Sequence, residues 1–301
     1  MNAKIKKWLV LAGVMLIIGG TIFVVSMSYL KWDFNKLSLA KYENNSYSVT
    51  ESFSSLAIDT DTADVTFAIS TDNSVRVDLY EESNAKHEVL VEDGTLKITV
   101  KNNKAWYEYI GFNFSSPKIT VYLPLGAYGN LDIDLSTGDI VIPNGYFFNN
   151  VQINGSTADV IFNASASGSV NIDLSTGDIV IKNASAPAFS LMVTTGDIEL
   201  IDVNLGTLVS SGSTGDVDLI RVIAIGKIDI TRTTGDVEFE SIDASELYIK
   251  TTTGDVEGSL LSSKIFIVET NTGDKRVPQT TTGGKCEIKT GTGDVEITVV
   301  Q

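Results

Sequence analysis

A three-residue motif, Thr-Gly-Asp, recurs through the second half of the chain at an almost constant interval. It begins at Thr137, Thr176, Thr195, Thr214, Thr234, Thr253, Thr272 and Thr292. A Thr-Ala-Asp variant at Thr157 fills the one gap, so successive threonines are 19 or 20 residues apart. A fixed period of this length is typical of repeat architectures, in which each repeat supplies one small supersecondary unit.

Alternating apolar residues stand on both sides of each motif. In the first repeat Leu131 and Ile133 precede it, and Ile140 and Ile142 follow it. Alternation with period two indicates strands that bury one face, and stacked coils about 4.8 Å apart can bury it jointly. The sequence therefore predicts an all-β fold, a parallel β-solenoid (β-helix) with 19–20 residues per coil. We expect nine windings or so and a length of about 40 Å.

The motif itself has the chemistry of a tight corner. Glycine supplies a positive φ, aspartate accepts hydrogen bonds from nearby amides, and threonine favours strands. An alternative is a calcium ladder formed by Asp178, Asp197, Asp216, Asp236 and Asp255. Calcium needs six to eight oxygen ligands, and the glycine-rich nonapeptide of calcium-binding β-rolls is missing. We expect a structural corner and no cofactor, with calcium as the alternative.

An uncharged run near the N-terminus predicts a membrane helix. Trp8 to Leu30 holds 23 residues without a charge and follows Lys4, Lys6 and Lys7. This length spans the hydrocarbon core, and the positive-inside tendency places residues 1–7 in the cytoplasm and the C-terminal domain outside the cell. A cleaved signal peptide is the alternative, although its apolar region is normally shorter. The prediction is a single-pass protein of the cell membrane.

The rest of the chain divides into three segments. Residues 31–50 show no sustained period and are interpreted as a tether. Residues 51–130 contain β-rich runs, a hairpin signal at Glu92-Asp93-Gly94 and a Thr62-Ala63-Asp64 copy of the variant motif. They are interpreted as an N-terminal β cap with degenerate first coils. Residues 131–301 form the solenoid with the Thr-Gly-Asp corners.

Charge and the rarity of two residue types exclude several functions. The net charge is -16, which repels nucleic acid and anionic head groups. Cys286 is the only cysteine and His87 the only histidine, so neither an internal disulfide nor a zinc site is expected. His87 lies in a polar stretch without a serine motif nearby. We expect it at the surface rather than in a catalytic site.

Two basic residues depart from the columns that the repeat defines. Arg232 stands two residues before its motif, where other repeats hold Leu, Gly, Val or Thr. It is interpreted as an edge residue whose head reaches solvent, with an anion anchor or lyase-like base as the alternative. Lys275 takes a place that is otherwise Ile or Val, and a local bulge near the end of the stack is the expected explanation.

An outward column two residues beyond each aspartate gives a candidate interaction surface. It begins with Val141, Ile161 and Val180 and continues mostly with acids. The aromatic run with Trp106, Tyr107 and Tyr109 lies close in sequence. We expect this run to cover the three apolar side chains. The alternatives are an exposed patch that receives a partner and aromatic rings that stack on sugars.

Several features together resemble the bacterial putative adhesin family, a domain of unknown function. They are the basic start, the membrane helix, VYLP at Val121 to Pro124, LDIDLSTGDI from Leu131 and the recurring Gly-Asp turns. The resemblance covers roughly Phe53 to Val300. It implies a surface-exposed β-solenoid, sometimes encoded with cell-envelope stress systems, and it carries over no catalytic residue.

Three functions remain in consideration. The favoured one is an extracellular adhesion, binding or scaffolding module for cell-wall polymer, a host surface or an envelope-complex protein. The second is an accessory protein of a cell-envelope stress response. The third is a polysaccharide-cleaving β-helix enzyme. The acids repeat in identical columns, whereas a catalytic pair needs one carboxyl in a distinct environment, so no enzyme activity is expected.

Overall fold

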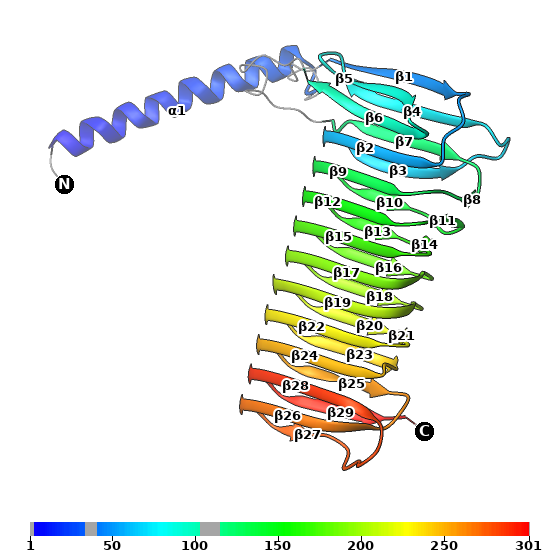
Figure 1. Cartoon of the computed structure of the whole chain (residues 1–301). Coiled ribbons are helices and arrows are strands. Elements are labelled where there is room, and N and C mark those ends of the chain that lie inside the picture. Colours follow the sequence, from blue (N-terminus) through cyan, green and yellow to red (C-terminus); the bar gives the residue numbers. More distant parts are fainter. Residues whose placement is uncertain (1–2, 34–40, 103–114, 301) are drawn as a thin grey trace.

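The computed structural model describes residues 3–33, 41–102 and 115–300. Helix α1 (Ala3–Tyr29) leads to an array of strands that stack in one direction (Figure 1). Its segment Ile5–Tyr29 is, within the described residues, the one helix long and apolar enough to cross a membrane. None of that apolar window is buried against the rest of the chain, as expected of a helix whose surroundings are lipid.

Two parallel sheets run the length of the stack, one with the strand before each motif and one with the strand after it. The first set is β9 (Leu131–Thr137), β12 (Val151–Thr157), β15 (Ser169–Thr176), β17 (Ser185–Thr195), β19 (Asn204–Thr214), β22 (Lys227–Thr234), β24 (Glu246–Thr253), β26 (Lys264–Thr272) and β28 (Gly284–Thr292). The second set is β10 (Ile140–Ile142), β13 (Val160–Phe162), β16 (Ile179–Lys182), β18 (Ile198–Ile201), β20 (Val217–Ile220), β23 (Val237–Ile242), β25 (Val256–Leu260), β27 (Lys275–Arg276) and β29 (Val295–Val299). Motif threonines lie opposite one another, as Thr157 does between Thr137 and Thr176. The predicted parallel β-solenoid is confirmed.

The core lies between the two sheets, where the predicted inward columns meet. Leu131, Ile133, Ile140 and Ile142 are all buried, and the pattern repeats through the stack. Each coil also has a third, shorter side that the sequence did not predict. It includes β8 (Gly126–Ala127), β11 (Tyr146–Phe148), β14 (Ser165–Ala166) and β21 (Ile223–Ala224).

The cap contains two further coils and an antiparallel cover. Its strands are β1 (Tyr42–Val49), β2 (Ser55–Thr62), β3 (Asp64–Ile69), β4 (Val75–Glu82), β5 (Ala85–Glu92), β6 (Thr95–Asn102) and β7 (Lys118–Leu123). β2 pairs with β9 with Thr62 opposite Thr137, so β2 stacks on the solenoid as part of a further coil. β5 and β6 form the predicted hairpin, with Asp93 and Gly94 at positive φ. β1 pairs with β4, so part of the expected tether belongs to the cap.

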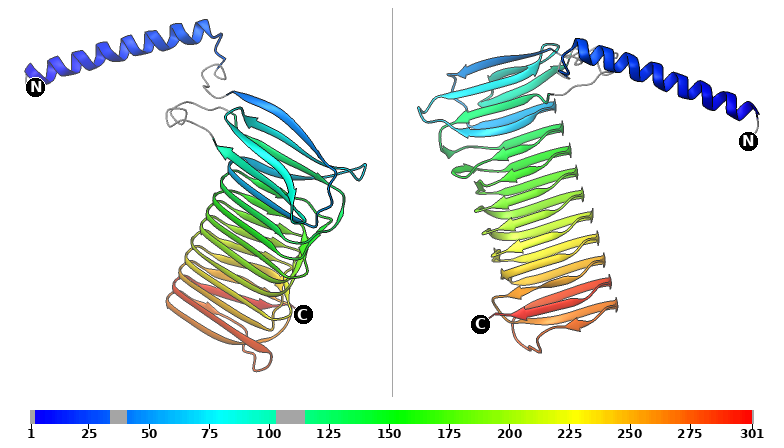
Figure 2. Two further views of the ribbon diagram at one scale, coloured as in Figure 1. Left: turned by 45° about the horizontal axis from the view of Figure 1, so that its top comes forward. Right: turned by 180° about the vertical axis from the view of Figure 1, so that it is seen from behind.

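The order of coils in space departs from the order in sequence at both ends. At the N-terminal end β2 lies between β6 and β9, and at the C-terminal end β28 lies between β24 and β26. Both inversions are visible in Figure 1, and Figure 2 shows the same stack from behind. The coil that comes last in sequence is therefore an internal coil. The outermost pair of strands is β26 and β27.

Candidate binding surfaces

The Thr-Gly-Asp corners form a continuous hydrogen-bond ladder. The Asp197 N–H donates to Asp178 Oδ1 at 2.8 Å, and the Asp216 N–H donates to Asp197 Oδ1 at 2.8 Å. The ladder passes in spatial order through Asp64, Asp139, Asp159, Asp178, Asp197, Asp216, Asp236, Asp255, Asp294 and Asp274. Each aspartate thus connects its own corner to the next one.

Glycine is required at these corners by backbone conformation and by space. Gly196 has φ of 146°, and a Cβ there would lie 2.0 Å from the Gly177 carbonyl oxygen. The corner geometry thus accounts for the glycine and the aspartate of the motif. Within the described part of the chain, no group of three or more His, Cys, Asp or Glu side chains is arranged to hold a metal ion. The calcium alternative stays a prediction that melting with calcium or a chelator tests.

The outward column of the second sheet begins with the predicted apolar residues. Ile161 lies between Val141 and Val180 on adjacent strands and is 39% exposed, whereas both valines are half-buried. Trp106, Tyr107 and Tyr109 lie outside the described residues, so the cover that we expected them to provide stays a prediction. The three apolar residues form one strip on the flank of the solenoid.

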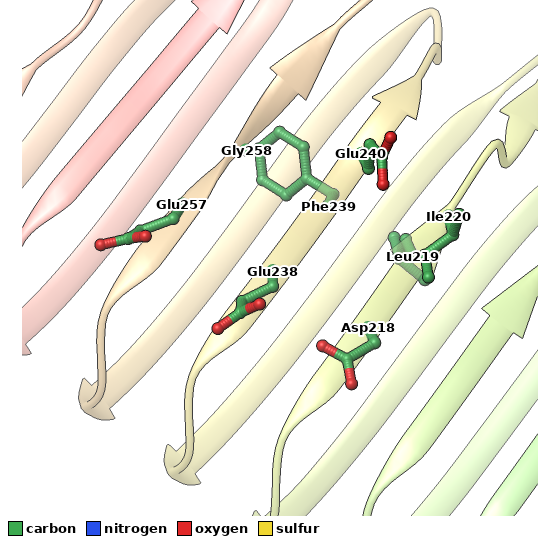
Figure 3. A pocket seen from close by; sticks show the side chains of 8 residues that line it. All are labelled: Asp218, Leu219, Ile220, Glu238, Phe239, Glu240, Glu257 and Gly258. Carbon is green, nitrogen blue, oxygen red and sulfur yellow. The ribbon is translucent and has the colours of Figure 1, made fainter.

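Acidic side chains continue this column toward the far end. In spatial order they are Glu199, Asp218, Glu238, Glu257 and Glu296, followed by Arg276. Figure 3 shows Asp218, Glu238 and Glu257 in a row on successive strands, beside a shallow groove of about 430 Å³. Burial, and then the charge of Glu238, raises the pKa of Asp218. The column is a repulsive acidic strip that ends in the Arg276–Glu296 ion pair at 3.2 Å.

The third side of the solenoid carries an apolar groove that the sequence did not indicate. Phe147, Pro187, Ile223 and Ile225 line it, and its volume is about 460 Å³. Ile225 is 86% exposed, the largest exposed fraction of any large apolar side chain in the solenoid coils that the structure describes. A sequence signal for the third side did exist, because buried apolar pairs recur eight and ten residues after the motif threonine, as in Ala184/Ala186, Val203/Leu205 and Val222/Ala224.

Arg232 is a core residue, so its interpretation as an edge residue was wrong. Its side chain is 2% exposed, and Nη2 donates to Ser210 Oγ at 3.4 Å while Nε and Nη1 have no partner. Burial lowers the pKa of the guanidinium. Gly212 leaves room for it, because a Cβ at that position would lie 1.9 Å from Nη1. Arg232 thus fills space that Ser210 and Gly212 leave, and it does not present its charge to a surface ligand.

Lys275 is exposed for a simpler reason than a bulge. β27 pairs in register with β29, with Lys275 opposite Val295 and Arg276 opposite Glu296. The expected bulge is therefore wrong. Lys275 tolerates a charge because β27 is the outermost strand of its sheet, so no further coil covers it.

His87 is also buried, which corrects the expected surface position. It lies in β5 and is 4% exposed; its Nδ1 is 2.9 Å from Glu81 Oε2 and its Nε2 is 2.9 Å from Thr60 Oγ1. This Thr-His-Glu order is that of a nucleophile, base and acid. Thr60 is itself buried, however, so no substrate reaches its hydroxyl. The contacts instead attach β4 and β5 of the cap to β2, the first coil.

The far end of the stack combines exposed apolar side chains on β26 with two exposed cations, Lys275 and Arg276, on β27. Ile265 and Ile267 of β26 point outward and are 44% and 42% exposed. Residues 261–301 hold five acidic and five basic side chains, whereas residues 131–260 hold 19 acidic and five basic ones. We call β26 and β27 together the tip. It differs in both polarity and charge from the acidic flank.

Comparison with known proteins extends these observations to a family. The structure resembles a putative adhesin of Bacteroides fragilis, with 18% identity, a TM-score of 0.52 and coverage of 86% of this chain and 97% of that one. A putative lipid binding protein of Parabacteroides distasonis gives 16% identity, a TM-score of 0.52 and the same coverage. A putative adhesin of the same organism gives 14% identity, a TM-score of 0.50 and coverage of 86% and 98%. These likenesses show the fold.

No match was found among curated proteins. A sequence model of the Toastrack DUF4097 family, in contrast, matches residues 53–219 and 196–301. These two overlapping matches include the cap coils, the corner ladder and the tip. The chain therefore belongs to the Toastrack DUF4097 family.

Proposed function

We propose that this chain is a membrane-anchored binding module of the cell surface, which adheres or scaffolds and does not catalyse. One observation carries the proposal, the separation of the apolar helix from the exposed tip. The helix precedes the cap in the chain, and the tip lies at the opposite end of a stack that a continuous hydrogen-bond ladder holds together. A rod of this kind holds a binding surface away from the membrane. The acidic flank favours a partner that is neither nucleic acid nor an anionic lipid surface.

The chemistry of the surface supports binding over catalysis. Corner aspartates accept ladder hydrogen bonds, and the Thr60–His87–Glu81 contacts lie inside the cap. The apolar groove beside Ile225 and the tip are instead open to solvent. Cell-wall polymer, a host surface or an envelope protein are the partner classes that such surfaces suit. Two structural neighbours described as adhesins agree with this assignment.

The proposal predicts an outward orientation and a gain of attachment. Protease added to intact cells should remove the portion after residue 30, and cells carrying the full chain should attach to a host or cell-wall surface more than cells carrying residues 1–50. A soluble marker in the cytoplasm reports lysis. A portion that is fully protected from protease in intact cells would contradict the outward orientation. Equal attachment of the two cell types would contradict the adhesive role.

A further inference from the structure

The two ends of the solenoid offer different edges to other molecules. At the N-terminal end, antiparallel β1, β4 and β5 lie beyond the cap coils. At the tip, β26 pairs with β28 on one side, and no described strand pairs with its other side. The Thr280 hydroxyl donates to the carbonyl of Lys264, so the first residue of the edge is occupied and residues 265–272 remain. An open edge of this length is a template for another strand.

The outward face of β26 begins with two exposed apolar side chains, Ile265 and Ile267, before Glu269. Ile265 and Ile267 lie opposite Lys285 and Glu287 of the neighbouring strand β28. The inward face is also incompletely covered. Phe266 and Val268 are only half-buried, whereas Cys286 and Ile288 in the next coil are fully buried. Both faces of β26 would therefore gain burial from one more coil.

The shape of this edge restricts what can occupy it. Two strand edges, one from each sheet, lie side by side, so a matching surface needs two edges at the same separation. A second solenoid end meets this condition. The cap of another copy does not, because antiparallel strands cover it. The matching surface is therefore the tip of a second copy.

A symmetric arrangement satisfies both sheets at once. A twofold axis normal to the sheets would place β26 antiparallel to its copy and β27 antiparallel to its copy. Charge disfavours this contact less than a contact between the flanks. β27 brings Lys275 and Arg276 of the two copies close together, but Arg276 is paired with Asp274 and Glu296. The strongly acidic residues 131–260 of the two copies stay at a distance.

We infer that the tip is a homotypic docking surface, which joins two copies end to end through β26 and β27. The membrane helices then lie at the two far ends, so the partners belong to opposed membranes. This inference rests on the proposed function and names the partner of its exposed end. It makes the chain a bridge between two surfaces that both display it.

The area of the contact determines whether pairing is detected between single molecules or only between membranes that display many copies. An edge of nine residues is about 30 Å long, and two sheets are about 10 Å apart, so each copy buries a few hundred Å². A stable pair buries about 800 Å² per partner. We therefore expect weak pairing of single molecules and strong pairing of membranes that display many copies.

Full-length chain in uncharged phosphatidylcholine vesicles tests the inference. Two vesicle populations with different dyes should cluster when both carry the chain and should stay separate when only one does. Ile267→Lys should reduce clustering at least tenfold, because it places a charge in the centre of the contact. Val209→Lys is the matched control, since Val209 is a comparably exposed outward residue of β19, in the same sheet as β26 but away from the tip. It should leave clustering unchanged. Equal melting of both variants and the parent verifies folding.

Cysteine substitution gives a second readout. Burial raises the pKa of the native Cys286 thiol to about 12, so Cys286 is a poor partner for oxidation. Cysteine placed in turn at Ile265, Ile267 and Glu269 should give a covalent dimer across clustered vesicles at one or more positions. Val209→Cys should give none. Absence of a dimer at all three tip positions in clustered vesicles would overturn the tip contact.

Each remaining outcome separates this inference from the proposed function. Clustering with the chain on one population only would show lipid recognition and overturn self-pairing. Clustering that Ile267→Lys leaves intact would place the contact elsewhere. Cells that attach to a host or cell-wall surface, combined with vesicles that never cluster, would keep the proposed function and reject the homotypic tip.

Discussion

The two ends of the solenoid share an inverted order of coils and differ in what lies beyond them. At each end the coil nearest the chain terminus in sequence is inserted one place inside the stack. At the N-terminal end antiparallel strands then close the edge, and at the tip nothing described does. In this fold the inverted coil order therefore holds the chain ends, and a separate element, the antiparallel strands, closes a sheet edge.

The inversion protects the ends of the chain from fraying. In a stack with nearest-neighbour contacts, a terminal coil has one interface and opens most readily. Here the last coil in sequence, β28 and β29, contacts one coil on each side. The first coil, β2 and β3, does the same at the other end. The outermost coil, β26 and β27, is instead internal in sequence, so the chain continues into folded strands from both of its ends.

Buried polar links strengthen the two ends unequally. In the cap, Glu81 is fully buried and contacts both His87 and Asn45. Near the tip, the Lys264 ammonium is buried and lies 2.7 Å from Asp243 Oδ1, but that carboxylate is partly exposed. Water therefore screens the tip link more than the cap link. The cap is fixed where the chain leaves the membrane, and the tip is left open.

The largest expected effect is the loss of the inserted coil. Deleting residues 284–301 removes one coil and leaves the coil of β26 and β27 without its neighbour, so two coils are lost from the folded stack. We expect a decrease of more than about 5 kcal/mol, which lowers the melting temperature by about 10–20 °C. Deleting residues 42–49 removes only the strand that covers β4, and it should cost much less. Equal losses in thermal melts would show that the inversion has no stabilising role.

A smaller effect is expected from the buried link of the cap. Glu81→Ala removes the buried carboxylate that contacts His87 Nδ1 and Asn45 Nδ2, and it should cost about 3–5 kcal/mol. Glu88→Ala is the control, because the Glu88–Lys101 pair 2.7 Å apart is exposed and on the same hairpin. It should change stability by less than about 1 kcal/mol. Denaturant unfolding of both variants measures the difference, and similar values would mean that the cap does not depend on this link.

The interior of the stack should respond to Arg232 with the opposite sign. Arg232→Met keeps an unbranched apolar side chain and removes a buried cation with two unpartnered nitrogens. We expect the stability to stay equal or to rise by about 1–2 kcal/mol. Arg221→Met, at an exposed pair with Asp202, should stay within about 0.5 kcal/mol. A clear loss at Arg232 in chemical unfolding would show that the guanidinium has a partner that it needs.

The acidic strip gives the smallest expected effect, with a defined pH dependence. Burial raises the pKa of Asp218 in the folded protein, so stability falls as pH rises through that pKa. Asp218→Asn should therefore be more stable at pH 7, by less than about 1 kcal/mol. The difference should vanish below the unfolded pKa of about 3.9. Asp132→Asn on the other sheet controls for the loss of one negative charge, and an identical pH profile would argue against local repulsion.

The regular part of this fold could be predicted because its physical cause repeats every 19 or 20 residues. The positive φ at Gly196 requires a glycine, and the hydrogen bond from the Asp197 N–H to Asp178 Oδ1 requires an aspartate. The same two requirements recur along the corner ladder. The inverted order could not be predicted from the same signal. Thr253 pairs with Thr292, and Thr272 also pairs with Thr292, but identical motifs do not specify which neighbours meet.

The irregular residues were missed because their cause lies in another coil or another strand. Arg232 becomes a core residue only because Ser210 and Gly212 of the previous coil are small. The small residues Ser210 and Gly212 and the large residue Arg232 were all visible in the inward sequence columns. Considering them together would have predicted that the guanidinium lies inside. His87 looked like a loop residue because Glu81 and Thr60 come from different strands. The apolar groove beside Ile225 belongs to a third side whose inward pairs, such as Val203/Leu205 and Val222/Ala224, do recur with the repeat, but Ile225 itself points outward and follows no column.

The corner ladder also determines how this molecule would respond to a pulling force. Every ladder bond runs along the axis that joins the membrane end to the tip, so tension between two opposed surfaces stretches these bonds directly. Coils should then yield one by one, each releasing 19 or 20 residues, or about 65 Å of extended chain. A pull applied at the C-terminus would first have to extract the inserted coil from between two others. Such a rod would lengthen in steps under load, and the contact between the two tips would then survive a sudden pull.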